Sequence, residues 1–170
     1  MSHRAVIFCF VTLSASAVLA QPWEKPANCP AQLRTLGTGI QRCPADGCTI
    51  KVTVIPPTET TPCIASIDNG DFRVTPSAGS NRRITWQISS CPASKCRFDD
   101  TEGIHILTDP DTQMFDRSFN PGSPRVYKWK DKNRVNRAVA TYEPRVWWQS
   151  TPGAPRQACC PIDPKITNDN

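Results

Sequence analysis

The stretch Arg83–Ile88, RITWQI, decides the fold that we expect for this chain. Its apolar residues Ile84, Trp86 and Ile88 alternate with polar ones, which is the period-2 pattern of a strand with one buried face. The stretch Thr49–Ile55, TIKVTVI, alternates in the same way. We therefore predict two half-buried strands, with Trp86 as the central inward aromatic side chain.

Further strand-like runs follow along the chain, separated by turn signals, and no run has the spacing of a long helix. They are Cys63–Ile67, Phe72–Thr75, Cys96–Phe98, Gly103–Leu107, the two arms of Tyr127–Trp148, and Lys165–Thr167. Pro supplies 17 of the 170 residues, which also disfavours helices. About eight or nine short strands with frequent turns predict an all-β sandwich or barrel. We favour a disulfide-stabilised, immunoglobulin-like β-sandwich, because such domains bury a strand tryptophan of the Trp86 kind.

Two stretches have the pattern of β-hairpins. Asp68-Asn69-Gly70-Asp71 separates two strand-like runs, and an Asn-Gly centre favours the type I′ turn of a two-stranded hairpin. In Tyr127–Trp148, alternating arms flank Asp131-Lys132-Asn133-Arg134, whose Asp and Asn favour a turn. Pro144 lacks an N–H group, so we expect it at a bulge or an edge of the return arm.

Residues 1–20 have the pattern of a secretory signal peptide. His3 and Arg4 form a short basic region, Ala5–Leu13 is apolar, and small residues follow up to Ala20. The apolar run is too short to span a bilayer. The cleavage site lacks the cysteine that a lipid anchor would need, so we expect no such anchor. We predict a secreted or periplasmic protein with no transmembrane segment. A Pro- and Cys-rich segment would occupy residues 21–47, and the β-domain residues 48–170.

Cysteine usage supports export. Of nine cysteines, Cys9 lies in the signal segment, and the other eight are Cys29, Cys43, Cys48, Cys63, Cys91, Cys96, Cys159 and Cys160. An even number in an exported chain predicts a disulfide framework. The near copies CPADGC and CPASKC, residues 43–48 and 91–96, could each close a local ring. Adjacent cysteines are too close for an unstrained bond, so Cys159 and Cys160 are expected to pair with Cys29 and Cys63. Zinc binding by the Cys-x4-Cys spacing is the alternative, which an oxidising compartment disfavours.

The formal net charge is +5, and most of it is local. Residues 125–156 hold eight Lys or Arg against Asp131 and Glu143. Such a cluster is either a solvated rim that protects a strand edge from aggregation or an anion-binding surface. The candidate binding residues are Lys128, Lys130, Lys132, Arg134, Arg137, Arg145 and Trp147.

Among the aromatic residues of this stretch, Tyr127, Trp129, Trp147 and Trp148 suggest how a ligand could be held. We assign Trp129 and Trp148 to the core and expect Trp147 to be exposed beside Arg145. An exposed ring can stack on a sugar or a base while Lys and Arg bind acid groups. Anionic polysaccharide or an envelope surface fits an exported protein better than nucleic acid, for which no motif is present.

Catalytic and metal-binding patterns are weak. His105 is the one histidine beyond the signal segment, and no Gly-x-Ser-x-Gly motif accompanies it. Residues 99–116 carry six acids, namely Asp99, Asp100, Glu102, Asp109, Asp111 and Asp116. These could bind calcium or serve a glycosidase with His105, but they do not fit the twelve-residue calcium loop. A simpler use is electrostatic, with this acidic loop lying near the basic stretch and partly offsetting its charge. We expect no cofactor.

Three functions follow from these patterns. The first is a non-catalytic module that binds an anionic glycan or envelope surface through the cationic, aromatic stretch. The second is a structural module that contacts another protein through a strand edge or its cysteine-linked tail, with the cations serving only solubility. The third is a hydrolase using His105 and nearby acids.

Overall fold

The computed structural model describes residues 22–31, 41–44, 47–68, 72–74, 82–92, 94–108, 115–116, 123–132 and 139–168. Within these ranges the regular structure is entirely β, which confirms the predicted class. The fourteen strands are β1 (Gln41–Cys43), β2 (Cys48–Ile55), β3 (Ile64–Ile67), β4 (Phe72–Val74), β5 (Arg82–Ile88), β6 (Cys96–Phe98), β7 (Ile104–Thr108), β8 (Phe115–Asp116), β9 (Val126–Asp131), β10 (Val139–Pro144), β11 (Val146–Trp148), β12 (Gln157–Ala158), β13 (Cys160–Pro161) and β14 (Lys165–Asn168). That is more than the expected eight or nine, because several are only two or three residues long. No helix in this part of the chain is long and apolar enough to cross a membrane.

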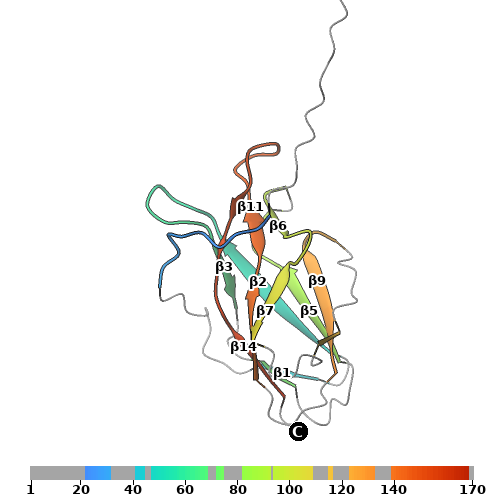
Figure 1. Ribbon diagram of the computed structural model, residues 1–170. Helices are drawn as coiled ribbons and strands as arrows, with labels where there is room; N and C mark the ends of the chain where they lie inside the picture. The colour runs from blue at the N-terminus through green and yellow to red at the C-terminus, as the bar shows by residue number, and fades with distance from the viewer. Residues whose placement is uncertain are drawn as a thin grey trace, which may run out of the picture.

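The strands form three sheets. The largest has the order β13-β3-β2-β5-β9-β8, the second β1-β4-β14-β10-β7, and the third β12-β11-β6. Figure 1 shows β2, β5 and β9 of the largest sheet, with β11 and β6 at the opposite end of the molecule from β1. Pairing is mixed, since β2 runs parallel to β5 while β9 runs antiparallel to it.

The predicted alternation is confirmed in the largest sheet. On β2, Ile50 and Val52 are fully buried, and on β5 the Trp86 side chain has no exposed surface. The Trp86 ring makes edge contacts with Trp129 of β9 at 5.8 Å and with Tyr142 of β10 at 5.5 Å between centroids. Trp86 therefore lies where the inward faces of two sheets meet, and edge contacts of this kind stabilise aromatic cores.

Both predicted hairpins are wrong as pairings. The strands β3 and β4, which flank the Asn-Gly turn, lie in different sheets, where β3 pairs with β2 and β13. The arms of Tyr127–Trp148 also separate, because β9 pairs with β5 and β8 while β10 pairs with β7 and β14. Alternation identifies a strand and its inward face, but distant segments with better-matched apolar faces can replace the sequence neighbour as its partner.

Pro144 ends β10 opposite Ile104, and the pairing of β10 with β7 is irregular between Thr141 and Tyr142. The chain then passes from the second sheet to the third at Arg145. The expected interruption near Pro144 is therefore confirmed.

The predicted disulfide framework is confirmed. The bonds are Cys29–Cys160, Cys43–Cys48, Cys63–Cys159 and Cys91–Cys96. Each of the two short rings also contains a Pro carbonyl that accepts an N–H group three residues later, from Gly47 and Lys95 respectively. Gly47 has a φ of 107°, and an added Cβ there would overlap the Arg83 carbonyl oxygen. Only glycine therefore allows the first ring to close against β5.

Candidate functional site

The outer surface of the largest sheet carries basic side chains at its centre. We call this surface the basic face and define it by seven of the outward residues of β2, β5 and β9, namely Thr49, Lys51, Arg83, Thr85, Gln87, Lys128 and Lys130. They alternate with the buried residues of the same strands, so the inward core fixes their orientation. Four of the seven are cations and none is an acid.

Two cations of the basic face lie directly opposite one another. Arg83 and Lys130 are register partners across the antiparallel pair β5 and β9, and both are exposed. Lys128 lies two residues before Lys130 on β9, and its register partner on β5 is Thr85. Neither Arg83 nor Lys130 forms an ion pair with any residue that the structure describes, and the register partner of Lys130 on its other side is Asp116 of β8. Like charges directly opposite in a sheet are destabilising, so this arrangement opposes folding unless an anion lies nearby.

The structure brings only part of the predicted binding set together. Lys128 and Lys130 share the basic face, and Lys132 lies half-buried just beyond the end of β9. Arg134 and Arg137 lie outside the described residues. Arg83 and Lys51 join the face from β5 and β2, and neither was predicted. The alternation of Arg83–Ile88 already places Arg83 outward, so that signal was present in the sequence.

Arg145 is placed elsewhere and binds groups of the protein itself. Its Nη1 donates to Glu102 Oε2 at 2.9 Å, and its Nε donates to Glu143 Oε1 at 3.2 Å. Its guanidinium carbon lies 5.0 Å from the ring centre of Trp23, which is a cation–π contact. Lys25 Nζ approaches Glu143 Oε2 at 3.9 Å, and Glu143 is almost fully buried. Arg145 therefore neutralises a buried acid, and its donors are not directed to a ligand on the basic face.

The predicted roles of the two adjacent tryptophans are reversed. Trp147 is only 5% exposed, and its Nε1 donates to Asp99 Oδ2 at 2.9 Å. Trp148 is half-buried and packs against the edge of the core. The prediction of an exposed Trp147 is wrong because Asp99 offers a buried acceptor for the indole N–H group, a partner that buried tryptophans usually find. The prediction that Trp129 is a core residue is confirmed.

The acids at residues 99–102 are bound by protein donors. Asp99 Oδ1 accepts two backbone N–H groups of its own loop, at 3.0 and 2.9 Å. Asp100 pairs with Arg97, and its other oxygen lies 3.6 Å from Arg156 Nη1. In the part of the chain that the structure describes, no group of three or more His, Cys, Asp or Glu side chains is placed to hold a metal ion. Asp109 and Asp111 lie outside that part, and only the backbone of Asp116 is described.

His105 is half-buried on β7 and faces Glu102. Its Nδ1 lies 2.9 Å from Glu102 Oε2, the oxygen that also accepts a hydrogen bond from Arg145. The expectation that the acidic loop offsets nearby basic charge is confirmed by the Glu102–Arg145 ion pair. His105 and Glu102 thus belong to one ionic network with Arg145 and Glu143.

The phenol of Tyr127 has a perturbed protonation equilibrium. Tyr127 is buried on the inward side of β9, and its pKa is raised above its ordinary value, first by burial and then by the charges of Glu102 and Asp99. Gly103 makes room for the ring, because an added Cβ there would lie 2.8 Å from Tyr127 Cδ2. The inward side of β9 therefore holds a neutral phenol near two acids, whereas the outward side carries the cations Lys128 and Lys130.

No protein-family model matches this chain, and no curated protein matches it.

Proposed function

We propose that this chain is an exported, non-catalytic binding module that holds an anionic polysaccharide or an envelope surface on its basic face. The observation that supports this most is the exposed pairing of Arg83 with Lys130 across β5 and β9. Repulsion between these side chains reduces stability, and a bound acid group between them would replace that repulsion with attraction. Binding of an anion should therefore stabilise this face more than it would stabilise isolated surface lysines.

The geometry of the face suits a repeating polyanion. Lys128 and Lys130 project from the same side of one strand, two residues apart, at a spacing of about 7 Å along the strand. Arg83 lies beside them on the neighbouring strand, and Thr49, Thr85 and Gln87 offer neutral hydrogen-bonding groups around them. Cations on a rigid sheet lose little further freedom on binding, which favours affinity.

Export and the finer fold class belong to the same proposal. Four disulfides are typical of oxidising compartments, and residues 1–20 have the pattern of a signal peptide. The contact between Trp86 and Tyr142 supports an immunoglobulin-like packing of two sheets. The parallel pairs, such as β2 with β5, differ from the antiparallel sheets of that fold, so the comparison extends to the architecture only.

Retention on immobilised heparin, used as a model polyanion, tests the proposal. The variant Arg83→Gln/Lys130→Gln should elute at clearly lower salt than the parent protein, because both lost cations face the ligand. The matched control Lys25→Gln/Arg42→Gln removes the same charge away from the basic face and should elute close to the parent. Equal losses in the two variants would mean that only net charge matters, and the proposal would then be wrong.

A protein-contact role through a strand edge is the second candidate. Among the described strands β7 ends the second sheet, pairing only with β10, and its Leu107 is 43% exposed. An edge strand with an exposed apolar side chain can accept a strand from a partner. Replacing Leu107 with Lys should abolish cross-linking to a partner if this role holds, whereas heparin retention should not fall.

A further inference from the structure

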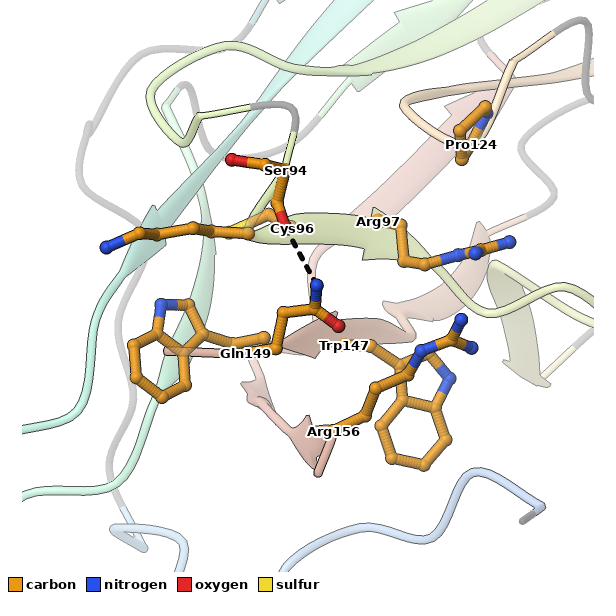
Figure 2. Close-up of a pocket in the computed structure, with 9 residues that line it drawn as sticks. Ser94, Cys96, Arg97, Pro124, Trp147, Gln149 and Arg156 are labelled. Atoms are coloured by element: carbon orange, nitrogen blue, oxygen red, sulfur yellow. Dashed lines mark hydrogen bonds between the residues drawn. The ribbon is translucent and has the colours of Figure 1, made fainter. Parts of the chain in front are cut away.

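A small hollow lies beside the third sheet, away from the residues that define the basic face. Its volume is about 130 Å³, and it is lined by Ser94, Lys95, Cys96, Arg97, Pro124, Trp147, Trp148, Gln149 and Arg156. Figure 2 shows the guanidinium groups of Arg97 and Arg156 on the same side of the hollow as the Trp147 ring. Sites for drug-sized ligands usually have about 300–1,000 Å³, so this hollow fits one ring rather than an oligomer.

The charge of the hollow favours an acid group. Lys95, Arg97 and Arg156 are its three cations. Two acids contact lining residues: Asp100 contacts both arginines, and Asp99 accepts a hydrogen bond from the Trp147 indole. One Asp100 oxygen accepts from Arg97 Nη2, and the other lies 3.6 Å from Arg156 Nη1. Two guanidinium groups thus converge on a single carboxylate, and each retains further donors. Arginine pairs of this kind recognise planar or tetrahedral acid groups strongly.

Two donors of the lining residues are buried without an acceptor. Arg97 Nε and Trp148 Nε1 have no hydrogen-bond partner in the described part of the chain. Most buried donors in proteins are paired, although Arg82 Nε, Trp86 Nε1 and Arg125 Nε are also unpaired in the described part of the chain. Arg97 Nε and Trp148 Nε1 are closed to solvent, so a ligand's acceptor oxygens would satisfy them only after these two side chains shift.

The remaining groups suit a sugar ring. Trp147 and Trp148 give the hollow apolar ring surface, and the Trp147 indole is fixed by its hydrogen bond to Asp99. Gln149 Nε2 donates to the Ser94 carbonyl at 2.9 Å, so the Gln149 side chain is held with its carbonyl oxygen available as an acceptor. Aromatic rings with a few fixed polar groups are typical of small-ligand sites.

We propose that this hollow binds a single sugar ring that carries an acid group, with the acid on Arg97 and Arg156 and the ring beside Trp147, the register partner of Arg97 on the same side of the third sheet. The second disulfide ring helps to form the site, because Cys91–Cys96 closes the loop that carries Ser94 and Lys95. The first ring has Gly47 where the second has Lys95, and it closes against Arg83. The two near-identical sequence motifs therefore serve different surfaces.

Calorimetric titration of the full chain with four small probes tests this inference. Glucuronate and glucose 6-phosphate carry both features, glucose lacks the acid, and acetate lacks the ring. We expect at least one of the two acidic sugars to bind at least about tenfold more tightly than glucose and acetate, a difference of about 1.4 kcal/mol. The carboxylate and phosphate probes distinguish which acid group the arginines prefer.

The variant Arg97→Gln/Arg156→Gln should weaken binding of the preferred acidic sugar by about tenfold or more, since charge-assisted hydrogen bonds would be lost. Arg156→Gln alone, at a more exposed position, provides the same test if the double variant does not fold. Lys130→Gln, on the basic face, should leave sugar binding unchanged. The inference is overturned if glucose or acetate binds as tightly as the acidic sugars, if no probe binds, or if the arginine variants bind like the parent. Heparin retention of Arg156→Gln reports separately on the proposed function.

Discussion

Arg145, between β10 and β11, and Arg83, on β5, carry the same charge, but their surroundings differ. Arg145 is surrounded by partners: it bonds Glu102 and Glu143 and lies over the Trp23 ring. Arg83 lies on an open surface with Lys130 opposite and forms no ion pair with a residue that the structure describes. The first cation is neutralised inside the fold, and the second is the one that we propose meets an external anion.

The difference shows that a count of cations does not identify a binding surface. The basic stretch contains both kinds, because β9 lies in the largest sheet while Arg145 lies between β10 and β11. What separates the two kinds is the presence of a buried acid within reach. The predictions below treat the surroundings of Arg145 and the basic face as independent parts of the molecule.

The largest effect is expected from removing the bond Cys29–Cys160, which fixes the segment that carries Trp23 and Lys25. Because Cys63–Cys159 already joins the tail to the domain, the additional closed loop has roughly 35 residues, and chain entropy then predicts a loss of about 4 kcal/mol. Urea unfolding of Cys29→Ser/Cys160→Ser measures this loss. Heparin retention should persist at temperatures where the variant is folded, and its disappearance would show that the two parts are coupled.

Replacing Arg145 with Met should also destabilise the protein strongly, because it leaves the buried Glu143 with only the looser and more exposed ion pair to Lys25, at 3.9 Å. Removing one partner of a buried ion pair usually lowers the free energy of unfolding by about 3–5 kcal/mol, and the partial exposure of Arg145 suggests about 3 kcal/mol. The measurement is urea unfolding, with the exposed Arg42→Met as the matched control. A loss below about 1 kcal/mol, typical of surface pairs, would contradict the assignment.

On the basic face, removing a cation should raise the free energy of unfolding instead of lowering it. Arg83→Gln removes one of two like charges that face each other and should raise the free energy of unfolding at low salt by about 0.5 kcal/mol. The gain should shrink as salt screens the repulsion. A variant that is less stable than the parent at low salt would show that Arg83 has a structural partner.

The smallest effect concerns the inward side of β9. The folded state holds the Tyr127 proton more tightly than the unfolded chain, because the pKa of the phenol is raised by burial. This contribution is complete below about pH 10 and is lost as the pH rises through the folded-state pKa. Tyr127→Phe should therefore lose less stability than the parent protein as the pH rises above about 10 in urea titrations. Parallel pH profiles would contradict the burial of this phenol.

Much of the fold could be predicted, and the reasons are physical. Alternation in Thr49–Ile55 and Arg83–Ile88 reports which side of a strand is apolar, so the inward residues and Trp86 were predicted correctly. The short distance between adjacent Cα atoms excludes an easy Cys159–Cys160 bond, so with two local rings Cys29 and Cys63 were identified as the partners of this pair. Which of the two joins Cys159 and which joins Cys160 was left open by the sequence and is given by the structure.

Strand partners could not be predicted in the same way. A turn sequence favours a hairpin by a small free energy, whereas burying Tyr127 and Trp129 against β5 removes a large apolar area from water. The exchange of roles between Trp147 and Trp148 depended on Asp99, which is distant in sequence and close in space. The surroundings of Arg145 were hidden for the same reason, since Trp23 and Glu102 come from other segments.

The salt dependence of heparin-oligosaccharide binding tests the central claim most directly. If Arg83 and Lys130 contact the polyanion, Arg83→Gln/Lys130→Gln should reduce the slope of log K against log salt by about 1–2, since each such contact releases about one counterion. The slope for Arg145→Met should equal that of the parent protein. An unchanged slope in the first variant, or an equal reduction in the second, would contradict the account.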